Sequence, residues 1–158
     1  MTVPVPDEWL AALQDSAVFD EFGGTELERI AALAEERAVP SNSPIGAQGE
    51  HSRELFVLLE GAVHVPSPTG QQTVLVLAPH DTYGLGGLVS PGRLLASAVT
   101  SGACRFLVIP IGSLRALAEA DTEFGRRLYY GLAREMAHRF EEVVADAQGR
   151  PRGNYLPH

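Results

Sequence analysis

The sequence predicts a mainly β protein: an antiparallel β-roll or jelly-roll barrel, with helices before it and a long helix after it. Between residues 37 and 110, six or more short apolar runs alternate with turn residues about every ten positions. This spacing, without long helical repeats between the runs, is typical of antiparallel rolls and barrels. On both sides of the region, apolar residues recur at helical intervals instead. The predicted organisation is an N-terminal helical segment at 1–36, a β-roll at 37–110, C-terminal helices at 111–148 and a disordered tail at 149–158.

Composition and charge narrow the class of function. The chain has 158 residues, of which 45% are apolar and 20% charged, enough for one domain with a real core. Its net charge is −8, so it lacks the basic surface of a nucleic-acid binder. No apolar run is long enough to span a membrane, and no secretory signal begins the chain. The single Cys104 fits a reducing compartment, and we expect a cytoplasmic protein without membrane contact.

Two short helices are expected in the N-terminal segment. Acidic residues open the first, an amphipathic run at 7–13. Thr25 can cap the second helix, because Glu28 follows three residues later in the spacing of a capping box. The apolar repeat then predicts that this helix runs to about Glu36.

The β-roll is expected to consist of short strands joined by glycine-containing turns. Strands are predicted at 55–59, 62–65, 73–77, 94–99 and 104–109. Turns are predicted at Glu60-Gly61, Ser67–Gly70 and Ser101-Gly102. Each turn places glycine between two apolar runs, which is the pattern of an antiparallel hairpin.

A glycine-rich cassette, residues 79–100, is the most informative stretch. Gly84, Gly86 and Gly87 would allow backbone N–H groups to approach a ligand closely, as in a loop that cradles an anion. Arg93 follows, and arginine can bind a phosphate through two hydrogen bonds. A glycine-rich turn that closes a hairpin would show the same residues. Both interpretations remain open at this point.

Two helices are expected after the roll. Ser113 can cap a short helix through Ala120, and Asp121 a longer one to Ala147. The long helix carries a regular apolar stripe, which would cover the roll, pair with a second copy, or do both. The candidate dimer interface is Phe124, Leu128, Leu132, Met136 and Phe140. The opposite, mixed-charge face is expected to be solvated and carries Arg127, Arg134, Glu135, His138 and Glu142.

The order of these elements and several short motifs resemble the cyclic-nucleotide-binding domain family, which includes catabolite activator protein-like sensory domains. Residues 45–50 (IGAQGE) are similar to the family's I-x-x-Q-G-E turn, and 55–61 (LFVLLEG) to its L-Y-x-I-x-x-G hairpin. Residues 80–84 (HDTYG) are similar to G-D-x-F-G, and Ala96-Ser97 to the A-T of the closing strand. The resemblance covers roughly residues 18–145 and implies that the cassette is a phosphate-binding unit for a cyclic nucleotide, cAMP or cGMP.

The implied site departs from the family pattern at both charged positions. Candidate ligand-binding residues are Tyr83, Gly84, Leu85, Gly86, Gly87, Leu88, Arg93, Leu94, Leu95, Ala96 and Ser97. Leu85 stands where the family has a glutamate for the ribose 2′-OH, and Leu94 where it has the phosphate-binding arginine. Losing both partners removes roughly 3–6 kcal/mol of binding free energy, about a hundredfold to ten-thousandfold in affinity. Arg93 lies one residue early and remains a candidate, because a bulged loop could still turn it inward.

No motif supports catalysis or a metal site. The histidines at 51, 64, 80 and 138 are scattered and include no His-x-His pair. Cys104 lies among apolar neighbours, as a packed thiol does, and neither Ser97 nor Thr100 has a histidine at a suggestive spacing for a triad. We therefore expect no enzyme, no metal and no cofactor besides a possible cyclic nucleotide.

The predicted function is that of a stand-alone, non-enzymatic regulatory module. Cyclic nucleotide binding is expected to be weak or lost, and action to proceed through an unknown protein partner, with a homodimer through the long helix possible. Only eleven residues follow Ala147, so the helix-turn-helix of the family's transcription factors, and DNA binding with it, is not expected. The alternative is a genuine cyclic nucleotide or small-anion sensor that uses the cassette glycines and Arg93.

Overall fold

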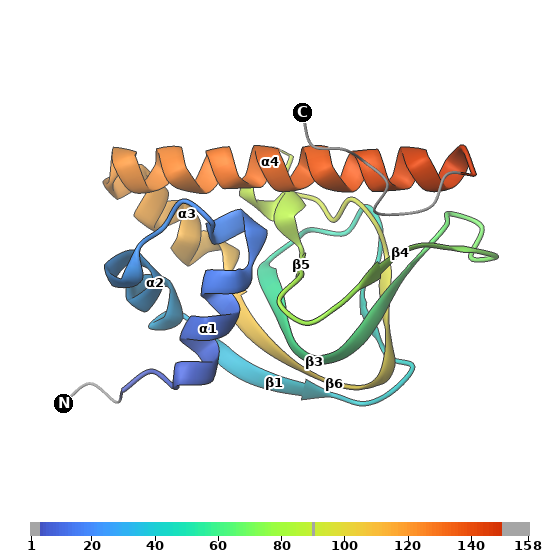
Figure 1. Cartoon of the computed structure of the whole chain (residues 1–158), viewed down its shortest axis with the longest axis horizontal. Coiled ribbons are helices and arrows are strands. Elements are labelled where there is room, and N and C mark those ends of the chain that lie inside the picture. Colours follow the sequence, from blue (N-terminus) through green and yellow to red (C-terminus); the bar gives the residue numbers. More distant parts are fainter. Residues whose placement is uncertain (1–3, 90, 150–158) are drawn as a thin grey trace.

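The molecule consists of a curved antiparallel sheet with helices at one end and a long helix across one side (Figure 1). The structure, a computed structural model, describes residues 4–89 and 91–149. With η for a 3₁₀ helix, the elements are α1 (Asp7–Asp15), η1 (Ala17–Phe19), α2 (Gly24–Ala31), β1 (Glu35–Val39), β2 (Pro44–Gly46), β3 (Glu54–Pro66), β4 (Thr73–Leu77), β5 (Thr82–Tyr83), η2 (Leu85–Leu88), β6 (Ala98–Pro110), α3 (Ile111–Ala120) and α4 (Thr122–Ala147). The predicted mainly β fold with flanking helices and a long C-terminal helix is confirmed.

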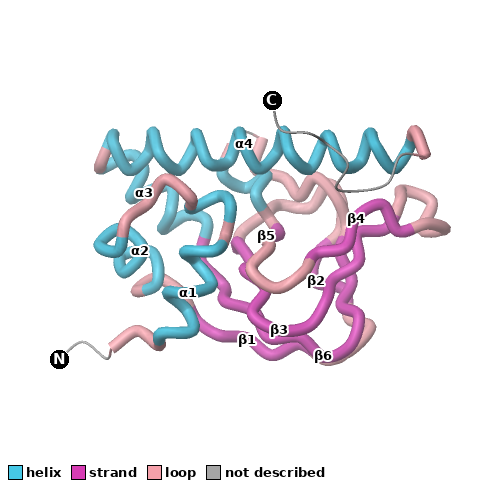
Figure 2. The backbone as a smooth tube through the Cα atoms, viewed as in Figure 1, coloured by secondary structure: helices cyan, strands magenta, loops and turns pink. Residues whose placement is uncertain are grey.

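The sheet is a roll rather than a closed barrel. Its six strands follow the order β1-β6-β3-β4, with β2 paired to β6 and β5 paired to β3, all antiparallel. Among the described residues, β1 and β4 form the two ends of this path and do not pair with each other. Figure 2 shows the strands gathered at one end and α1, α2 and α3 at the other. The roll therefore has an open side, and α4 lies across it (Figure 1).

Two predicted turns are wrong, because each lies inside one long bent strand. β3 and β6 are 13 residues each and pair along most of their length, from Glu54 opposite Pro110 to His64 opposite Val99. The pairing register shifts between Glu60 and Ala62, around Gly61 at φ 106°. A side chain at Gly61 would lie 2.6 Å from the Cys104 sulfur, so glycine is needed where the strands cross closely. The glycines thus mark bends in strands, not the ends of strands.

Helix boundaries differ from the prediction at α2 and α3. α2 ends at Ala31 rather than near Glu36, because residues from Glu35 pair with β6 as strand β1. Its start has no side-chain cap, so the predicted capping box does not form. Ser113 lies inside α3, which begins directly after β6. The predicted cap of α4 is confirmed: an Asp121 carboxylate oxygen accepts from the Phe124 N–H at 3.1 Å.

The core has two parts, and α4 closes one of them. The first lies among the helices and one face of the roll, and the second lies inside the roll. Phe124, Leu128 and Leu132 of α4 are buried in the first part, so these three are not available to a second copy as predicted. Phe140, in contrast, is 70% exposed. Among the described helices, none is long and apolar enough to cross a membrane.

Candidate functional site

The glycines of the cassette allow its backbone to pack directly against neighbouring backbone of the roll and of the cassette itself. After β5, Gly84 turns the backbone with φ 103° and η2 follows as one short turn. A side chain at Gly84 would collide with the Glu54 carbonyl oxygen, and one at Gly87 would lie 2.6 Å from the Ser52 carbonyl oxygen. A side chain at Gly86 would likewise collide with the Arg93 carbonyl oxygen. The glycines are therefore needed for close packing of the cassette against the roll.

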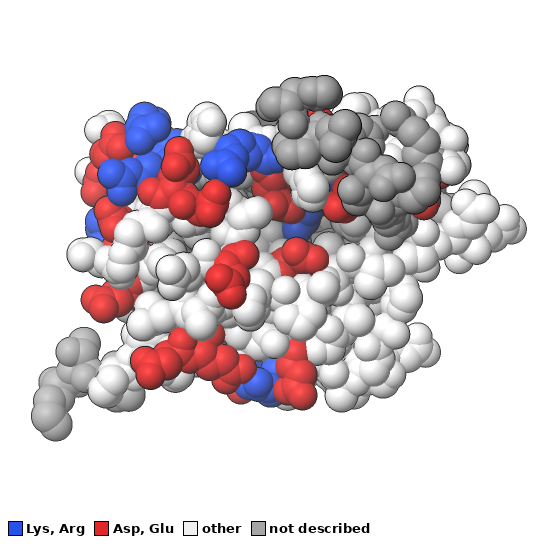
Figure 3. Space-filling view, viewed as in Figure 1, with Lys and Arg blue, Asp and Glu red and all other residues white. Residues whose placement is uncertain are grey.

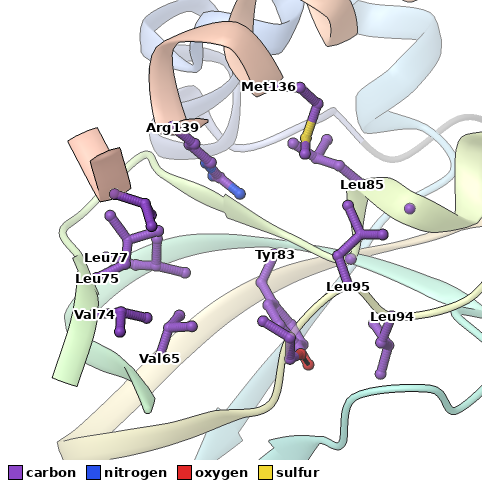
Figure 4. Close-up of a pocket in the computed structure, with 14 residues that line it drawn as sticks. Val65, Val74, Leu75, Leu77, Tyr83, Leu85, Leu94, Leu95, Met136 and Arg139 are labelled. Carbon is purple, nitrogen blue, oxygen red and sulfur yellow. Dashed lines mark hydrogen bonds between the residues drawn. The ribbon is translucent and has the colours of Figure 1, made fainter. Parts of the chain in front are cut away.

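A hollow lies between the roll, the cassette and α4, and Figure 4 shows its lining. Its volume is ≈ 170 Å³. The lining residues are Val65, Val74, Leu75, Leu77, Tyr83, Gly84, Leu85, Gly86, Leu94, Leu95, Ala96, Met136, Arg139 and Val143. Aliphatic side chains of the roll, the cassette and α4 make up most of this surface. The hollow is thus suited to an apolar occupant.

Tyr83 forms part of the floor with its polar end already satisfied. Burial raises the pKa of Tyr83 well above its usual value, and the nearby Glu50 carboxylate raises it further. The hydroxyl therefore stays protonated at neutral pH and donates to the Ala96 carbonyl oxygen at 2.7 Å. In this way Tyr83 ties β5 to the far side of the cassette and leaves its ring for the hollow.

Arg139 is the one charged residue among the described residues that line the hollow. Its Nε donates to a Glu135 carboxylate oxygen at 2.8 Å, and its Nη2 donates to both the carbonyl and, at 3.1 Å, the hydroxyl oxygen of Thr82. The side chains of Arg139 and Glu135 are 15% and 10% exposed. The guanidinium reaches from α4 towards the roll beside β5 (Figure 4). It links the long helix to the sheet.

Arg93 points away from the hollow. Its Nη1 donates to the Gly49 carbonyl oxygen at 2.7 Å, and the residue forms an isolated β-bridge with His51. The side chain is exposed, and Arg93 is not among the residues that line the hollow. The one-residue offset from the family position therefore places its guanidinium outside, while Leu94 lies inside.

The predicted site residues fall into two groups. Those that line the hollow are Tyr83, Gly84, Leu85, Gly86, Leu94, Leu95 and Ala96. Gly87, Leu88, Arg93 and Ser97 lie outside it. Leu88 is buried in the helical part of the core, and the Ser97 hydroxyl accepts from the Gln48 N–H at 2.9 Å. These two residues support the cassette from behind.

A family model decides the classification of the chain. The model of the cyclic nucleotide-binding domain matches residues 36–121, more than half of the sequence. The chain belongs to the cyclic nucleotide-binding domain family. The matched range contains the cassette, and the roll, cassette and long helix have the arrangement described above. A search of curated proteins finds no match.

Solved structures of cyclic nucleotide-binding proteins share this fold. A putative cyclic nucleotide-binding protein from Geobacter metallireducens is 25% identical, with a TM-score of 0.73 over 82% of this chain and 96% of that one. A cyclic nucleotide-binding domain from Methylobacillus flagellatus is 20% identical, with a TM-score of 0.76 over 95% and 86% of the two chains. The regulatory domain of Toxoplasma gondii PKA, solved with cAMP, is 18% identical, with a TM-score of 0.66 over 74% and 46%.

Within this family fold, α4 supplies residues of the hollow that were not among the predicted ligand-binding residues, and one of them, Met136, was predicted for the dimer interface instead. Met136, Arg139 and Val143 of α4 line the hollow, together with Val65 and three residues of β4. Glu135, predicted to be solvated, is instead buried beside Arg139. The i to i+4 spacing of Glu135 and Arg139 was the available signal, because such a pair can form an ion pair on one helix face. Nothing in the sequence indicates that this face meets β5.

Proposed function

We propose that this chain is a non-enzymatic regulatory module whose hollow does not hold cyclic nucleotides tightly, and which acts through contact with another protein. The observation that carries the proposal is the position of the charges. Leu85 and Leu94 line the hollow where family members place a carboxylate and a guanidinium, and Arg93 points outside. A cyclic phosphate would enter an apolar cavity without an unpaired cation, which is unfavourable.

The surface beside the hollow supports a role in protein contact. A groove between the cassette and α4 is lined by apolar residues: Leu85, Gly86, Val89, Leu95, Tyr129, Leu132, Ala133 and Met136. Leu95 is 59% exposed and Val89 is 45% exposed, which is unusual for large apolar side chains in one place. Several of these residues also line the hollow. A partner on this groove would therefore sense what the hollow contains.

Charge on the visible face agrees with this proposal. Arginine and acidic side chains gather over the helices and along the β1 edge, whereas the part of the roll that carries β4 is largely uncharged (Figure 3). β4 forms one wall of the hollow. Away from the atoms drawn in grey, few charged side chains therefore lie around β4 on this face (Figure 3).

The alternative is a genuine cyclic nucleotide or small-anion sensor, which family membership favours. In that case the amides of Gly84, Gly86 and Gly87 would bind the phosphate, and Arg93 would have to leave Gly49 and turn inward. Because the Arg93 side chain is exposed, it has room for this rotation. A binding measurement therefore separates the two functions.

Isothermal titration calorimetry with cAMP and cGMP tests the proposal. We expect no binding tighter than about 10 μM for either nucleotide, and no change in Arg93→Ala. Arg115→Ala, an exposed arginine of α3 outside the hollow, is the matched control. Binding tighter than this limit that disappears in Arg93→Ala but persists in the control would establish the sensor instead.

A further inference from the structure

We propose that the hollow binds an uncharged, mainly apolar molecule with one hydrogen-bond acceptor, and that Arg139 donates to that acceptor through Nη1. This inference rests on the proposed function, because a cyclic nucleotide would occupy the same space. Its support comes from three separate observations: the size of the hollow, the free donors of one side chain, and the local balance of charge.

The size of the hollow fits one ring or a short chain. Its volume is ≈ 170 Å³, and apart from Arg139 and the Tyr83 hydroxyl, which is bonded to Ala96, its walls are apolar or backbone. An apolar cavity of about 150 Å³ inside a protein can stay dry and bind benzene. A molecule of this size would contact the roll, the cassette and the helix at once, because all three contribute to the wall.

Arg139 has hydrogen-bond donors to spare at this wall. Nε is bonded to Glu135 and Nη2 is bonded twice to Thr82. Nη1 carries two N–H groups, and the described residues give it no acceptor. No fully buried side-chain nitrogen of the described residues lacks a partner, so Nη1 keeps some accessible surface. Figure 4 shows the guanidinium pointing into the hollow, where a ligand oxygen could accept from it.

The balance of charge selects an uncharged ligand. Glu135 already neutralises Arg139 at 2.8 Å, and both side chains are largely buried. A carboxylate or phosphate beside them would leave one uncompensated negative charge in apolar surroundings. A carbonyl or ester oxygen can accept the same hydrogen bond without that charge. The geometry therefore favours a neutral acceptor over an acid.

Three small probes separate these possibilities in an NMR titration of the ¹⁵N-labelled full chain. Acetophenone has a ring and a neutral carbonyl, isopropylbenzene has the same shape without an acceptor, and benzoate replaces the carbonyl with a charge. We expect acetophenone to shift the amide signals of Gly84, Gly86 and Met136, and benzoate to bind more weakly than acetophenone. Benzoate binding as tightly as acetophenone, or no shifts with acetophenone, would overturn the inference.

The role of Arg139 is tested by the ratio of two dissociation constants, because the two neutral probes differ in their affinity for water. In Glu135→Met/Arg139→Met, which leaves no unpaired buried charge, we expect acetophenone to lose about threefold to tenfold relative to isopropylbenzene. Arg134→Met, an exposed arginine of α4 that pairs with Asp20, should keep the wild-type ratio. An unchanged ratio in the double variant contradicts the assignment.

Adding cAMP to the same assay keeps the two proposals distinguishable. Saturation by cAMP below about 10 μM would contradict the proposed function itself. Weak cAMP binding together with no shift of the amide signals on addition of acetophenone would contradict only the inference about the neutral ligand.

Discussion

Single residues decide what the hollow can bind. Leu85 and Leu94 face it in place of charged side chains, and Arg93 differs from Leu94 by one position along the chain yet lies outside. A one-residue offset reverses the direction of a side chain in extended backbone. Arg139 contributes the one charged group of the described lining, and it comes from a helix rather than from the cassette. The chemistry of the hollow therefore depends on Leu85, Leu94 and Arg139, which line it, and on the outward position of Arg93.

Gly61 allows β3 to bend where it packs closely against β6. Its φ of 106° disfavours any other residue, and a side chain there would lie 2.8 Å from the Ala103 carbonyl oxygen. We predict that Gly61→Ala lowers the free energy of unfolding by about 2–4 kcal/mol, since strain and overlap add. Urea denaturation measures the change.

Gly102→Ala is the matched control for Gly61→Ala. Its φ of 75° is also positive, but no atom lies within 4 Å of the added carbon. Strain alone should then cost about 1–2 kcal/mol. Equal losses in the two variants would show that close packing of β3 on β6 at Gly61 is not required.

At the scale of elements, local patterns predicted the type of structure well and its boundaries less well. The strand at 73–77, the cap at Asp121 and the long helix all follow from neighbouring residues. Two turns were wrong, because a glycine with positive φ looks the same in a hairpin and in a bend of a long strand. α2 was predicted too long, because pairing of β1 with β6 overrides the helical repeat. Such pairings join residues far apart in sequence.

The long helix has an exposed apolar end that could serve self-association. Phe140 and Val143, both in the C-terminal half of α4, are exposed. We predict that the full chain forms a homodimer through this end of α4, because burial of an exposed Phe side chain against a second copy removes a large apolar surface from water, which is favourable. Sedimentation velocity at increasing concentration should show the dimer, and Phe140→Asp should shift it to monomer.

Val76→Asp is a suitable control for Phe140→Asp, because Val76 is also an exposed apolar residue but lies on β4 rather than on α4. It should leave the association unchanged. A chain that stays monomeric at all concentrations, or a dimer that tolerates Phe140→Asp, would contradict an interface at this end of the helix.

At the scale of the whole molecule, the family and the fold were predictable because they depend on the order of motifs along the chain. The site was predictable only in part. The cassette side of the hollow follows from residues 79–100, but the opposite wall comes from β4 and α4. Which face of α4 meets the roll depends on packing of Phe124, Leu128 and Leu132 in the core, and this packing also brings Arg139 to β5. That arrangement is a property of the folded chain.

The most direct test of the central claim, that the hollow has lost tight binding of cyclic nucleotides, is urea unfolding with and without about 1 mM cAMP. A ligand with a dissociation constant of about 10 μM would then be present at about a hundredfold excess over that constant and would add about 2.7 kcal/mol to the free energy of unfolding. We predict that the unfolding midpoint does not move. A stabilisation of about 2.7 kcal/mol or more would contradict the claim.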